Sequence, residues 1–332
     1  VATETGHSVA LSMLGGHYRN RVPDEWRAFT VREEMGLRSA RAAAHVQCVL
    51  NNFFVSADDE LEYKHALSLA DSHRASDREM GEALTSARVL WRRMQDTNDR
   101  VSVPHDAYLK IWALCKPKLP YDVVMIDEYQ DTNAVMERVM EQQTHATRVY
   151  IGDEHQSIYA FRGAVTAMQN LKDKGTHLTL SQSWRFGPIV AERANVLLRE
   201  LKGETLVIQG MGQDVPYQAG SSVTKLARTN AHLFEEAVHL RGQGIHWVGG
   251  VGRYQLHKLT DACHLMTGRR EQIRDPFIRN FTSFGEMKDY AEQAGEAETR
   301  IMVKVIEEFG HDTPALVAEI TKNEVKDAAH AS

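Results

Sequence analysis

The sequence predicts an α/β protein in which short parallel strands alternate with helices. One observation is a pair of short apolar runs, at residues 123–126 and 149–151, each followed by acidic or glycine residues. Continuous apolar runs of this length are typical of strands buried on both faces of a parallel sheet. The other observation is that apolar residues recur at spacings of three and four around these runs, which indicates helices. Strands that alternate with helices are the pattern of an α/β sheet.

Composition places the chain among ordinary globular proteins. Of its 332 residues, 42% are hydrophobic and 25% are charged. The length predicts more than one core, and the composition excludes collagen-like and wholly disordered classes. The 39 Lys and Arg residues against 45 Asp and Glu residues give a formal net charge of −6. This mild acidity does not exclude nucleic acid as a partner, because a local groove can bind a strand while the whole protein stays negative.

The cysteine and hydropathy patterns indicate an intracellular protein without a membrane partner. Cys48, Cys115 and Cys263 lie far apart, so sequence neighbours build neither a disulfide framework nor a CxxC zinc site. The longest purely aliphatic runs have about four residues, far below the ~18 that cross a bilayer. We therefore expect a cytoplasmic location, or a nuclear one in a eukaryote.

Helical patterns dominate both ends of the chain. One apolar stripe in the first hundred residues predicts an amphipathic helix. Its members are Met80, Leu84, Ala87, Trp91 and Met94. A second helix is predicted after Pro104. Strand signals vanish between residues 253 and 322, which predicts a separate helical insertion there.

The middle of the chain carries the remaining strand signals. Thr132 is expected to cap the helix between the first two strands. Pro188 is expected in the first turn of a later helix. Further strands are expected at residues 178–180, 223–227 and 245–248.

Polar side chains follow the ends of these strands, and in an open parallel sheet ligands bind outside the carboxyl ends of the strands. One carboxylate can hold Mg²⁺, another can deprotonate a water, amide and guanidinium groups can contact phosphate oxygens, and an indole can stack on a base. Nucleotide hydrolysis requires these groups. The residues are Asp127 and Glu128, Asp153 and Gln156, Trp184 and Arg185, and Arg228.

Longer segments around these residues resemble a known family. They read DEYQDTN at residues 127–133, GDEHQSIYAFRGA at 152–164 and SQSWRFG at 181–187. In order and spacing they resemble motifs II, III and IV of UvrD/Rep-type superfamily 1 DNA helicases. LARTN at 226–230 resembles motif IVa, and TGHS at 5–8 resembles the TxHS segment of motif Ia/Ib.

Three segments look closest to the F-box DNA helicase branch and its bacterial relatives, namely residues 105–110, 184–187 and 245–250. The resemblance implies two RecA-like (P-loop NTPase) lobes with parallel sheets, each with a helical insertion. The first lobe is expected at residues 1–20 and 104–178, its insertion at 21–103, the second lobe at 179–252 and 326–332, and its insertion at 253–325.

The resemblance also implies ATP and Mg²⁺ as cofactors and roles for the residues of motifs II and III. Asp127 would bind Mg²⁺, and Glu128 would be the general base for the attacking water. Gln130 and Gln156 would contact the γ-phosphate or its water, Gln156 as a catalytic residue.

Motif IV implies contributions from the second lobe. Arg185 would reach the γ-phosphate as a catalytic residue, and Trp184 would stack on adenine. The implied activity is ATP-dependent translocation on single-stranded DNA in the 3′ to 5′ direction. Single-stranded DNA and junctions between single and double strands are the expected partners.

The same resemblance implies DNA contacts. Tyr159 and Phe161 stand where the family stacks bases, with Arg162 beside them, and every base offers a π-face for stacking. Thr5 and His7 would touch the DNA backbone. For His7, a helix-capping or packing role is an open alternative.

The chain contains no GxxxxGK[ST] sequence, which in P-loop proteins cradles the α- and β-phosphates. We expect a chain that begins after this loop. Residues 329–332 resemble the first half of motif V, and the motif VI arginine is absent. The expected fragment hydrolyses ATP slowly or not at all.

Two other functions stay open at this point. One is a catalytically inactive helicase-like module that binds DNA or a protein partner without turnover. The other is a metal-dependent nuclease, because two-metal sites need converging carboxylates. Its carboxylates would be Asp127, Glu128, Asp131 and Asp153.

Overall fold

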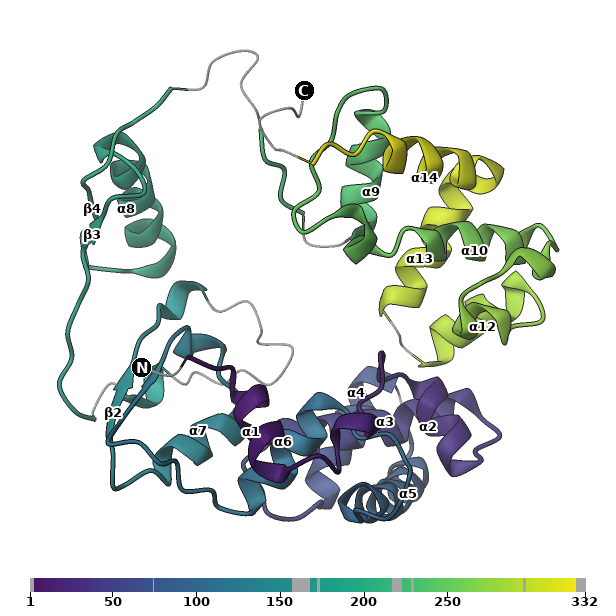
Figure 1. The fold of residues 1–332 in the computed structure, drawn as a ribbon, viewed down its shortest axis with the longest axis horizontal. Helices are drawn as coiled ribbons and strands as arrows, with labels where there is room; N and C mark the ends of the chain where they lie inside the picture. The colour runs from purple at the N-terminus through teal and green to yellow at the C-terminus, as the bar shows by residue number, and fades with distance from the viewer. Residues whose placement is uncertain are drawn as a thin grey trace. The chain divides into compact units, whose positions relative to one another are not determined.

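The computed structural model describes residues 3–73, 75–156, 168–171, 174–216, 223–227, 230–294 and 297–326. The chain divides into two compact units, whose elements are labelled in Figure 1. Unit 1 comprises Val1–Leu171 and Gln255–Val317, and unit 2 comprises Lys172–Tyr254 and Ala318–Ser332.

Unit 1 is mostly helical and contains one parallel strand pair within its described residues. Its first part contains α1 (Gly6–Leu14), α2 (Ala28–Met35), α3 (Ala40–Val55), α4 (Ser68–His73), α5 (Asp77–Gln95), α6 (His105–Leu114), β1 (Val123–Ile126), α7 (Ala134–Glu141) and β2 (Thr147–Tyr150). Its second part contains α10 (His257–Met266), α11 (Pro276–Arg279), α12 (Phe284–Ala294) and α13 (Ala297–Phe309).

Unit 2 is smaller. It contains β3 (Gln182–Ser183), α8 (Pro188–Lys202), β4 (Gln209–Gly210) and α9 (Asn230–His239). Helix α14 (Thr313–Lys322) crosses from unit 1 into unit 2. No helix among the described residues is both long and apolar enough to span a bilayer.

The strands β1 and β2 form a β-α-β unit with α7 between them. They pair in parallel, with Val123 opposite Thr147 and Ile126 opposite Tyr150. Helix α7 is capped by Asn133, whose side chain accepts a hydrogen bond from the Met136 N–H at 3.0 Å. The prediction that Thr132 caps this helix was therefore wrong by one residue. The parallel pairing agrees with the predicted α/β class, and the two RecA-like lobes stay a prediction.

The helical core of unit 1 centres on α3, which packs against α2, α5 and α6. Ser76 and Glu79 form a reciprocal capping box at the start of α5, and such caps contribute about 1 kcal/mol. All five residues of the predicted apolar stripe on this helix are buried, which confirms the stripe. The helix predicted after Pro104 is α6, and Pro104 is its N-cap.

The second part of unit 1 packs on the first. Helix α12 contacts α3, and ion pairs bridge the two parts. Glu25 accepts hydrogen bonds from Arg27 at 2.6 Å and from Lys258, and Arg27 reaches Glu298 at 3.1 Å. The helical character predicted for residues 253–322 is confirmed, whereas the expected domain division stays a prediction.

Three predicted strands are absent from the described residues. Leu178 and Leu180 are 90% and 88% exposed, and residues 178–180 form no strand. The strand β3 begins at Gln182. Residues 223–227 are also irregular, and residues 245–248 form only an isolated bridge from Ile245 to Glu324. Apolar alternation predicts a strand only where a neighbouring strand takes up its backbone hydrogen bonds.

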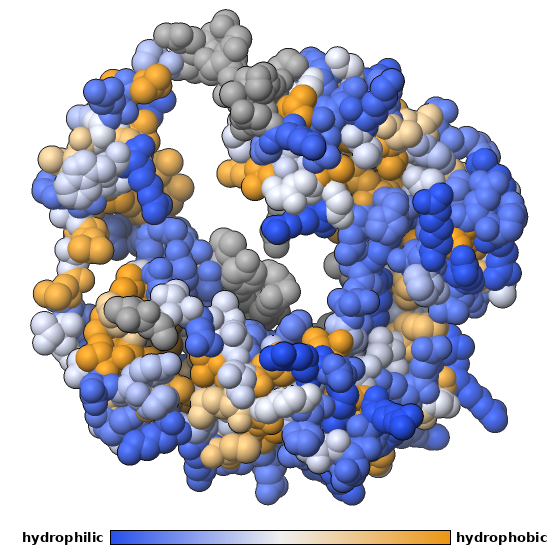
Figure 2. Space-filling view, in the orientation of Figure 1, coloured by the Kyte–Doolittle hydropathy of each residue, from blue (hydrophilic) through white to orange (hydrophobic). Residues whose placement is uncertain are grey.

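The predicted burial of the first strand on both faces was also wrong. Val123 and Met125 are exposed, and Val124 and Ile126 are half-buried. Apolar surface, shown in orange, lies over the β1–β2 region at the lower left of Figure 2. Strand patterns report which residues can be buried, and burial itself requires a layer on each face of the sheet.

Lys110 of α6 is a buried cation, with only 1% of its surface exposed. Its ammonium donates to the carbonyl oxygens of Ser56 at 2.7 Å and Asp58 at 2.6 Å, just beyond the end of α3. It also lies 4.3 Å from the centre of the Phe53 ring. Burial lowers the pKa of Lys110 to about 8, although the negative charge of Asp58 acts to raise this pKa.

We expect Lys110 to make the stability of the protein depend on alkaline pH. Between about pH 8 and the ordinary lysine pKa of about 10.5, the unfolded chain binds more protons than the folded chain, so stability rises with pH. Relative to Lys110→Met, the wild-type unfolding free energy should rise by about 3 kcal/mol at most across this window. Urea unfolding at a series of pH values measures the difference.

A surface lysine provides the matched control for this prediction. Lys288 is half-exposed and paired with Glu307 at 2.6 Å, which raises its pKa. Lys288→Met should therefore leave the pH dependence between pH 8 and 10 unchanged. If the difference in unfolding free energy between wild type and Lys110→Met does not change with pH, burial of the charged Lys110 ammonium does not destabilise the protein.

Candidate functional site

The carboxyl ends of β1 and β2 are joined by main-chain hydrogen bonds. The Ile151 N–H donates to the Ile126 carbonyl at 2.8 Å, and the Tyr129 N–H donates to the Ile151 carbonyl at 2.9 Å. These bonds continue the strand pairing beyond the last paired residues. They bring the segments that follow the two strands, which carry most of the predicted nucleotide site, against each other.

Glu128 adopts a left-handed backbone conformation with φ +53°. A non-glycine residue in this region is strained, and such strain persists only where neighbouring contacts hold it. The Gln130 side-chain amide donates to Glu128 Oε2 at 2.6 Å. Glu128 itself is exposed, so its carboxylate is accessible while one of its oxygens is held.

Gln130 joins the two segments from a buried position. It is only 2% exposed, and its side-chain oxygen accepts from the Asp153 N–H at 3.0 Å. Asp153 in turn accepts from the Gln156 side chain at 2.8 Å. Glu128, Gln130, Asp153 and Gln156 thus form one hydrogen-bonded chain. The two bonds that Gln130 makes use one N–H and one lone pair of its amide, and its contact with nucleotide stays a prediction.

Gly152 makes this close approach sterically feasible. A Cβ atom at this position would lie 2.5 Å from the side-chain oxygen of Gln130 and 3.1 Å from the backbone N of Tyr129. Real Cβ atoms essentially never approach a neighbour within 3.0 Å, and a distance of 3.1 Å is tighter than most Cβ contacts. The site therefore needs glycine at the end of β2 for reasons of space.

Asp127 lies next to this chain and is exposed. One of its oxygens accepts from the Glu128 N–H at 3.0 Å, and exposed carboxylate oxygens are the ligands that Mg²⁺ uses in nucleotide sites. A nuclease site would need several of its four expected carboxylates to converge. Among the described residues, no three of these four carboxylates bring their oxygen atoms within 4.8 Å of one another. The structure gives no support to the nuclease alternative, and the binding of Mg²⁺ by Asp127 stays a prediction.

The predicted DNA-contacting residues Thr5 and His7 lie at the start of α1. Thr5 is the N-cap, and its hydroxyl oxygen accepts from the Ser8 N–H at 3.1 Å. His7 Nε2 is 3.2 Å from an Asp106 carboxylate oxygen at the start of α6. The His105 ring packs edge-on against His7, and its pKa is lowered by burial and by the His7 charge. The contact of Thr5 and His7 with DNA stays a prediction.

The remaining predicted DNA-contacting residues lie outside the described residues. These are Tyr159, Phe161 and Arg162, and Arg228 of the motif IVa segment is also outside them. Their roles stay predictions from the sequence.

Trp184 and Arg185 lie in the loop between β3 and α8 of unit 2. Trp184 is 69% exposed, and Arg185 is exposed as well. The loop lies against the segment after β4, because the Met211 N–H donates to the Ser183 carbonyl at 2.7 Å and the Gly212 N–H donates to the Phe186 carbonyl at 3.0 Å. Both predicted nucleotide-contacting side chains are thus accessible on a backbone that is held from one side.

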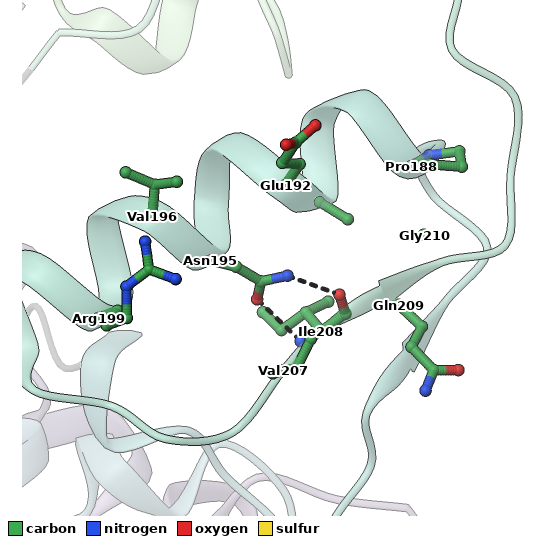
Figure 3. A pocket seen from close by; sticks show the side chains of 10 residues that line it. Pro188, Glu192, Asn195, Val196, Arg199, Val207, Ile208, Gln209 and Gly210 are labelled. Carbon is green, nitrogen blue, oxygen red and sulfur yellow. Dashed lines mark hydrogen bonds between the residues drawn. The ribbon is translucent and has the colours of Figure 1, made fainter.

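A groove of about 490 Å³ lies between α8 and the segment that forms β4, with Glu192 and Arg199 along the helix side (Figure 3). Asn195 joins the two walls, as the dashed lines in Figure 3 show. Its amide donates to the Ile208 carbonyl at 2.9 Å, and its oxygen accepts from the Ile208 N–H at 2.8 Å. One asparagine side chain therefore satisfies backbone groups that a neighbouring strand would otherwise satisfy.

Comparison with known families assigns the chain to one of them. The family described as UvrD/REP helicase N-terminal domain matches residues 2–176, which include the β1–β2 site. The chain belongs to the UvrD/REP helicase family. The predicted resemblance is confirmed.

Individual relatives of this UvrD/REP-family chain include F-box DNA helicases. F-box DNA helicase 1 of Gallus gallus is 30% identical over 100% of this chain and 36% of the relative. F-box DNA helicase protein 1 of Schizosaccharomyces pombe is 28% identical over 78% of this chain and 32% of the relative. The RecBCD enzyme subunit RecB of Escherichia coli is 36% identical over 24% of this chain and 7% of the relative. The chain spans about a third of the length of the two F-box relatives.

Sequence reasoning on this UvrD/REP-family chain missed several residues that hold the site. Asp106, which contacts His7, and Asp214, which contacts the start of α8, are far in sequence from the residues they touch. Only the spacing of Gly210 and Gly212 gave a signal, since closely spaced glycines indicate close backbone approach. Asn195 gave none, because asparagine on a helix is usually a surface residue.

Proposed function

We propose that this chain carries motor elements of an ATP-dependent DNA helicase or translocase that moves 3′ to 5′ on single-stranded DNA. The observation that supports this most is the hydrogen-bonded chain from Glu128 through Gln130 and Asp153 to Gln156. It joins the residues of motifs II and III at the carboxyl edge of a parallel strand pair, where α/β proteins bind ligands. The relatives named as DNA helicases support the same function.

The geometry fits the roles of a nucleotide hydrolase. Glu128 would accept a proton from the attacking water, and Gln130 fixes the position of its carboxylate by a 2.6 Å hydrogen bond. Gln156, held by Asp153, would orient the water or the γ-phosphate. Asp127 would hold Mg²⁺, which when bound neutralises charge on the phosphates. In unit 2, Trp184 and Arg185 present an exposed indole and guanidinium suited to adenine and phosphate.

The proposal includes weak hydrolysis by these 332 residues alone. They contain no GxxxxGK[ST] sequence to cradle the α- and β-phosphates, and this cradle contributes much of the electrostatic stabilisation of the transition state. The same observation favours a second candidate, a helicase-like module that binds DNA without turnover. The two candidates differ in whether ATP changes the binding of DNA.

One experiment on the 332-residue chain tests the proposal. Fluorescence anisotropy should show tighter binding of an oligo(dT) of about 20 nucleotides than of a duplex of the same length, by about tenfold. A junction with a 3′ single-stranded tail should bind more tightly than one with a 5′ tail. Mg²⁺ and ATP should change the affinity for oligo(dT). Hydrolysis with oligo(dT) should be no faster than that of the Glu128→Gln variant.

Each outcome has a definite meaning. Equal affinity for single strands and duplex would contradict the proposed translocase. Oligo(dT) binding that ignores ATP would favour the inactive module. DNA-stimulated hydrolysis that Glu128→Gln removes would contradict the expected weak hydrolysis while supporting the role of Glu128.

A further inference from the structure

The N-terminus of α8 is capped by a residue from elsewhere in unit 2. The helix starts at Pro188, and its N-cap, Gly187, has no side chain to offer. Asp214 takes this role, because its two carboxylate oxygens accept hydrogen bonds from the Ile189 N–H at 2.9 Å and the Val190 N–H at 3.3 Å. A carboxylate at this end of a helix satisfies free N–H groups and interacts favourably with the helix dipole.

Asp214 reaches the helix because three glycines, Gly187, Gly210 and Gly212, allow residues 183–187 and 210–214 to approach closely. A Cβ atom on Gly187 would lie 2.4 Å from the Asp214 carboxyl carbon. A Cβ atom on Gly210 would lie 2.2 Å from the Gly187 carbonyl oxygen, and one on Gly212 would lie 2.6 Å from the Trp184 carbonyl oxygen. Residues 183–187 and 210–214 therefore touch backbone to backbone along their length.

The side chains in this loop have little packing of their own to orient them. Trp184 is 69% exposed, and Arg185 is exposed. Within the loop, the Ser183 hydroxyl accepts from the Arg185 N–H at 3.3 Å. From outside, the Met211 and Gly212 N–H groups donate to carbonyls of the loop. The backbone that carries the indole and guanidinium is thus held on one side by the segment after β4, and Asp214 holds the first turn of α8, which follows the loop directly.

We propose that Asp214 is a positioning residue for nucleotide binding, which fixes the loop so that Trp184 and Arg185 present their side chains to adenine and the γ-phosphate. This inference rests on the proposed function, in which those two residues contact ATP. Asp214 does not touch the nucleotide. It acts by keeping the loop in one arrangement, and the apparent affinity for a ligand falls in proportion to the fraction of time a site spends in its competent arrangement.

A matched pair of variants separates positioning from stability. Asp214→Ala removes the two hydrogen bonds that hold the start of α8 to the segment after β4. Asn195→Ala removes two hydrogen bonds that join α8 to Ile208, about two helical turns further along. Both variants should lower the stability of unit 2, which thermal unfolding measures. Of the two residues, only Asp214 bonds the first turn of α8, next to the loop of Trp184 and Arg185.

The measurement is the affinity of the full 332-residue chain for the fluorescent ATP analogue mant-ATP with Mg²⁺, followed by energy transfer from tryptophan. Asp214→Ala should weaken binding about tenfold, as expected if the competent loop arrangement falls to about a tenth of the population. Asp214→Asn, which keeps an acceptor oxygen, should recover most of the affinity. Asn195→Ala should bind mant-ATP with wild-type affinity. The Trp184→Phe variant shows how much of the energy-transfer signal comes from the other tryptophans.

The outcomes distinguish this inference from the proposed function beneath it. If Trp184→Ala and Arg185→Ala leave affinity unchanged, or the wild type does not bind mant-ATP, the nucleotide role of the loop fails and this inference with it. If those two variants weaken binding but Asp214→Ala does not, only the inference is overturned. Equal weakening by Asp214→Ala and Asn195→Ala also overturns it, because a purely structural role predicts that result.

Discussion

Gly152→Ala should lower the unfolding free energy by about 4 kcal/mol and separate the two halves of the β1–β2 site. The added methyl would lie 2.5 Å from the Gln130 side-chain oxygen and 3.1 Å from the Tyr129 backbone N. Neither neighbour can retreat easily, because Gln130 is only 2% exposed and the Tyr129 N–H is bonded to Ile151. Overpacking costs about 1–3 kcal/mol, and a buried polar group that loses its partner costs a similar amount.

Gly81→Ala is the control for this change, since it adds the same methyl group where nothing obstructs it. Gly81 lies inside α5, and no atom lies within 4 Å of the position its Cβ would take. Alanine is the better helix former by about 1 kcal/mol, so this variant should be more stable than wild type. Urea unfolding of the three proteins measures both effects. Equal stability of Gly152→Ala and wild type would mean that the Gln130 side chain does not pack closely against Gly152, which would contradict the structure.

Local pattern predicted the helices of this protein well because each helix carries its own hydrogen bonds. The stripe on α5 and the start of α6 after Pro104 were correct, and the capping prediction at α7 missed by one residue. Both Thr132 and Asn133 are good caps in sequence, and only the course of the chain after η3 (Tyr129–Asp131) decides which of them stands at the helix start.

Strands were predicted less well because a strand depends on residues elsewhere in the chain. The run at 123–126 has a partner in β2 and forms a strand, whereas the run at 178–180 forms none. The run at 123–126 is wholly apolar, whereas the run at 178–180 carries Thr179 between two leucines. The difference between them is the presence of a neighbour that takes up the backbone N–H and C=O groups.

In the candidate site too, some residues could be predicted from local sequence and others could not. Motif order placed Asp127, Glu128 and Gln156 near one another, and the structure brings the segments that carry them together. The residues that hold these groups could not be predicted, because their roles are relations across space. Gln130 uses both ends of its side chain within the protein, and no local pattern distinguishes such a glutamine from one that reaches a ligand.

The largest effect on DNA binding is expected from the double variant Tyr159→Ala and Phe161→Ala. Both residues belong to the motif III segment and lie outside the described residues, so the prediction rests on the sequence. Base stacking on an aromatic ring contributes about 1–3 kcal/mol per base. Loss of two rings should therefore weaken oligo(dT) binding by about 30-fold or more, which fluorescence anisotropy at fixed salt concentration can measure.

The matched variant Tyr159→Phe distinguishes stacking from other uses of the tyrosine. It removes the hydroxyl and keeps the π-face, so stacking predicts near wild-type affinity for this variant and a large loss for the alanine change. The affinity should also show little preference among bases, because every base offers a face to stack on. If the double alanine variant binds oligo(dT) as tightly as wild type, stacking on Tyr159 and Phe161 does not contribute to the binding of single-stranded DNA.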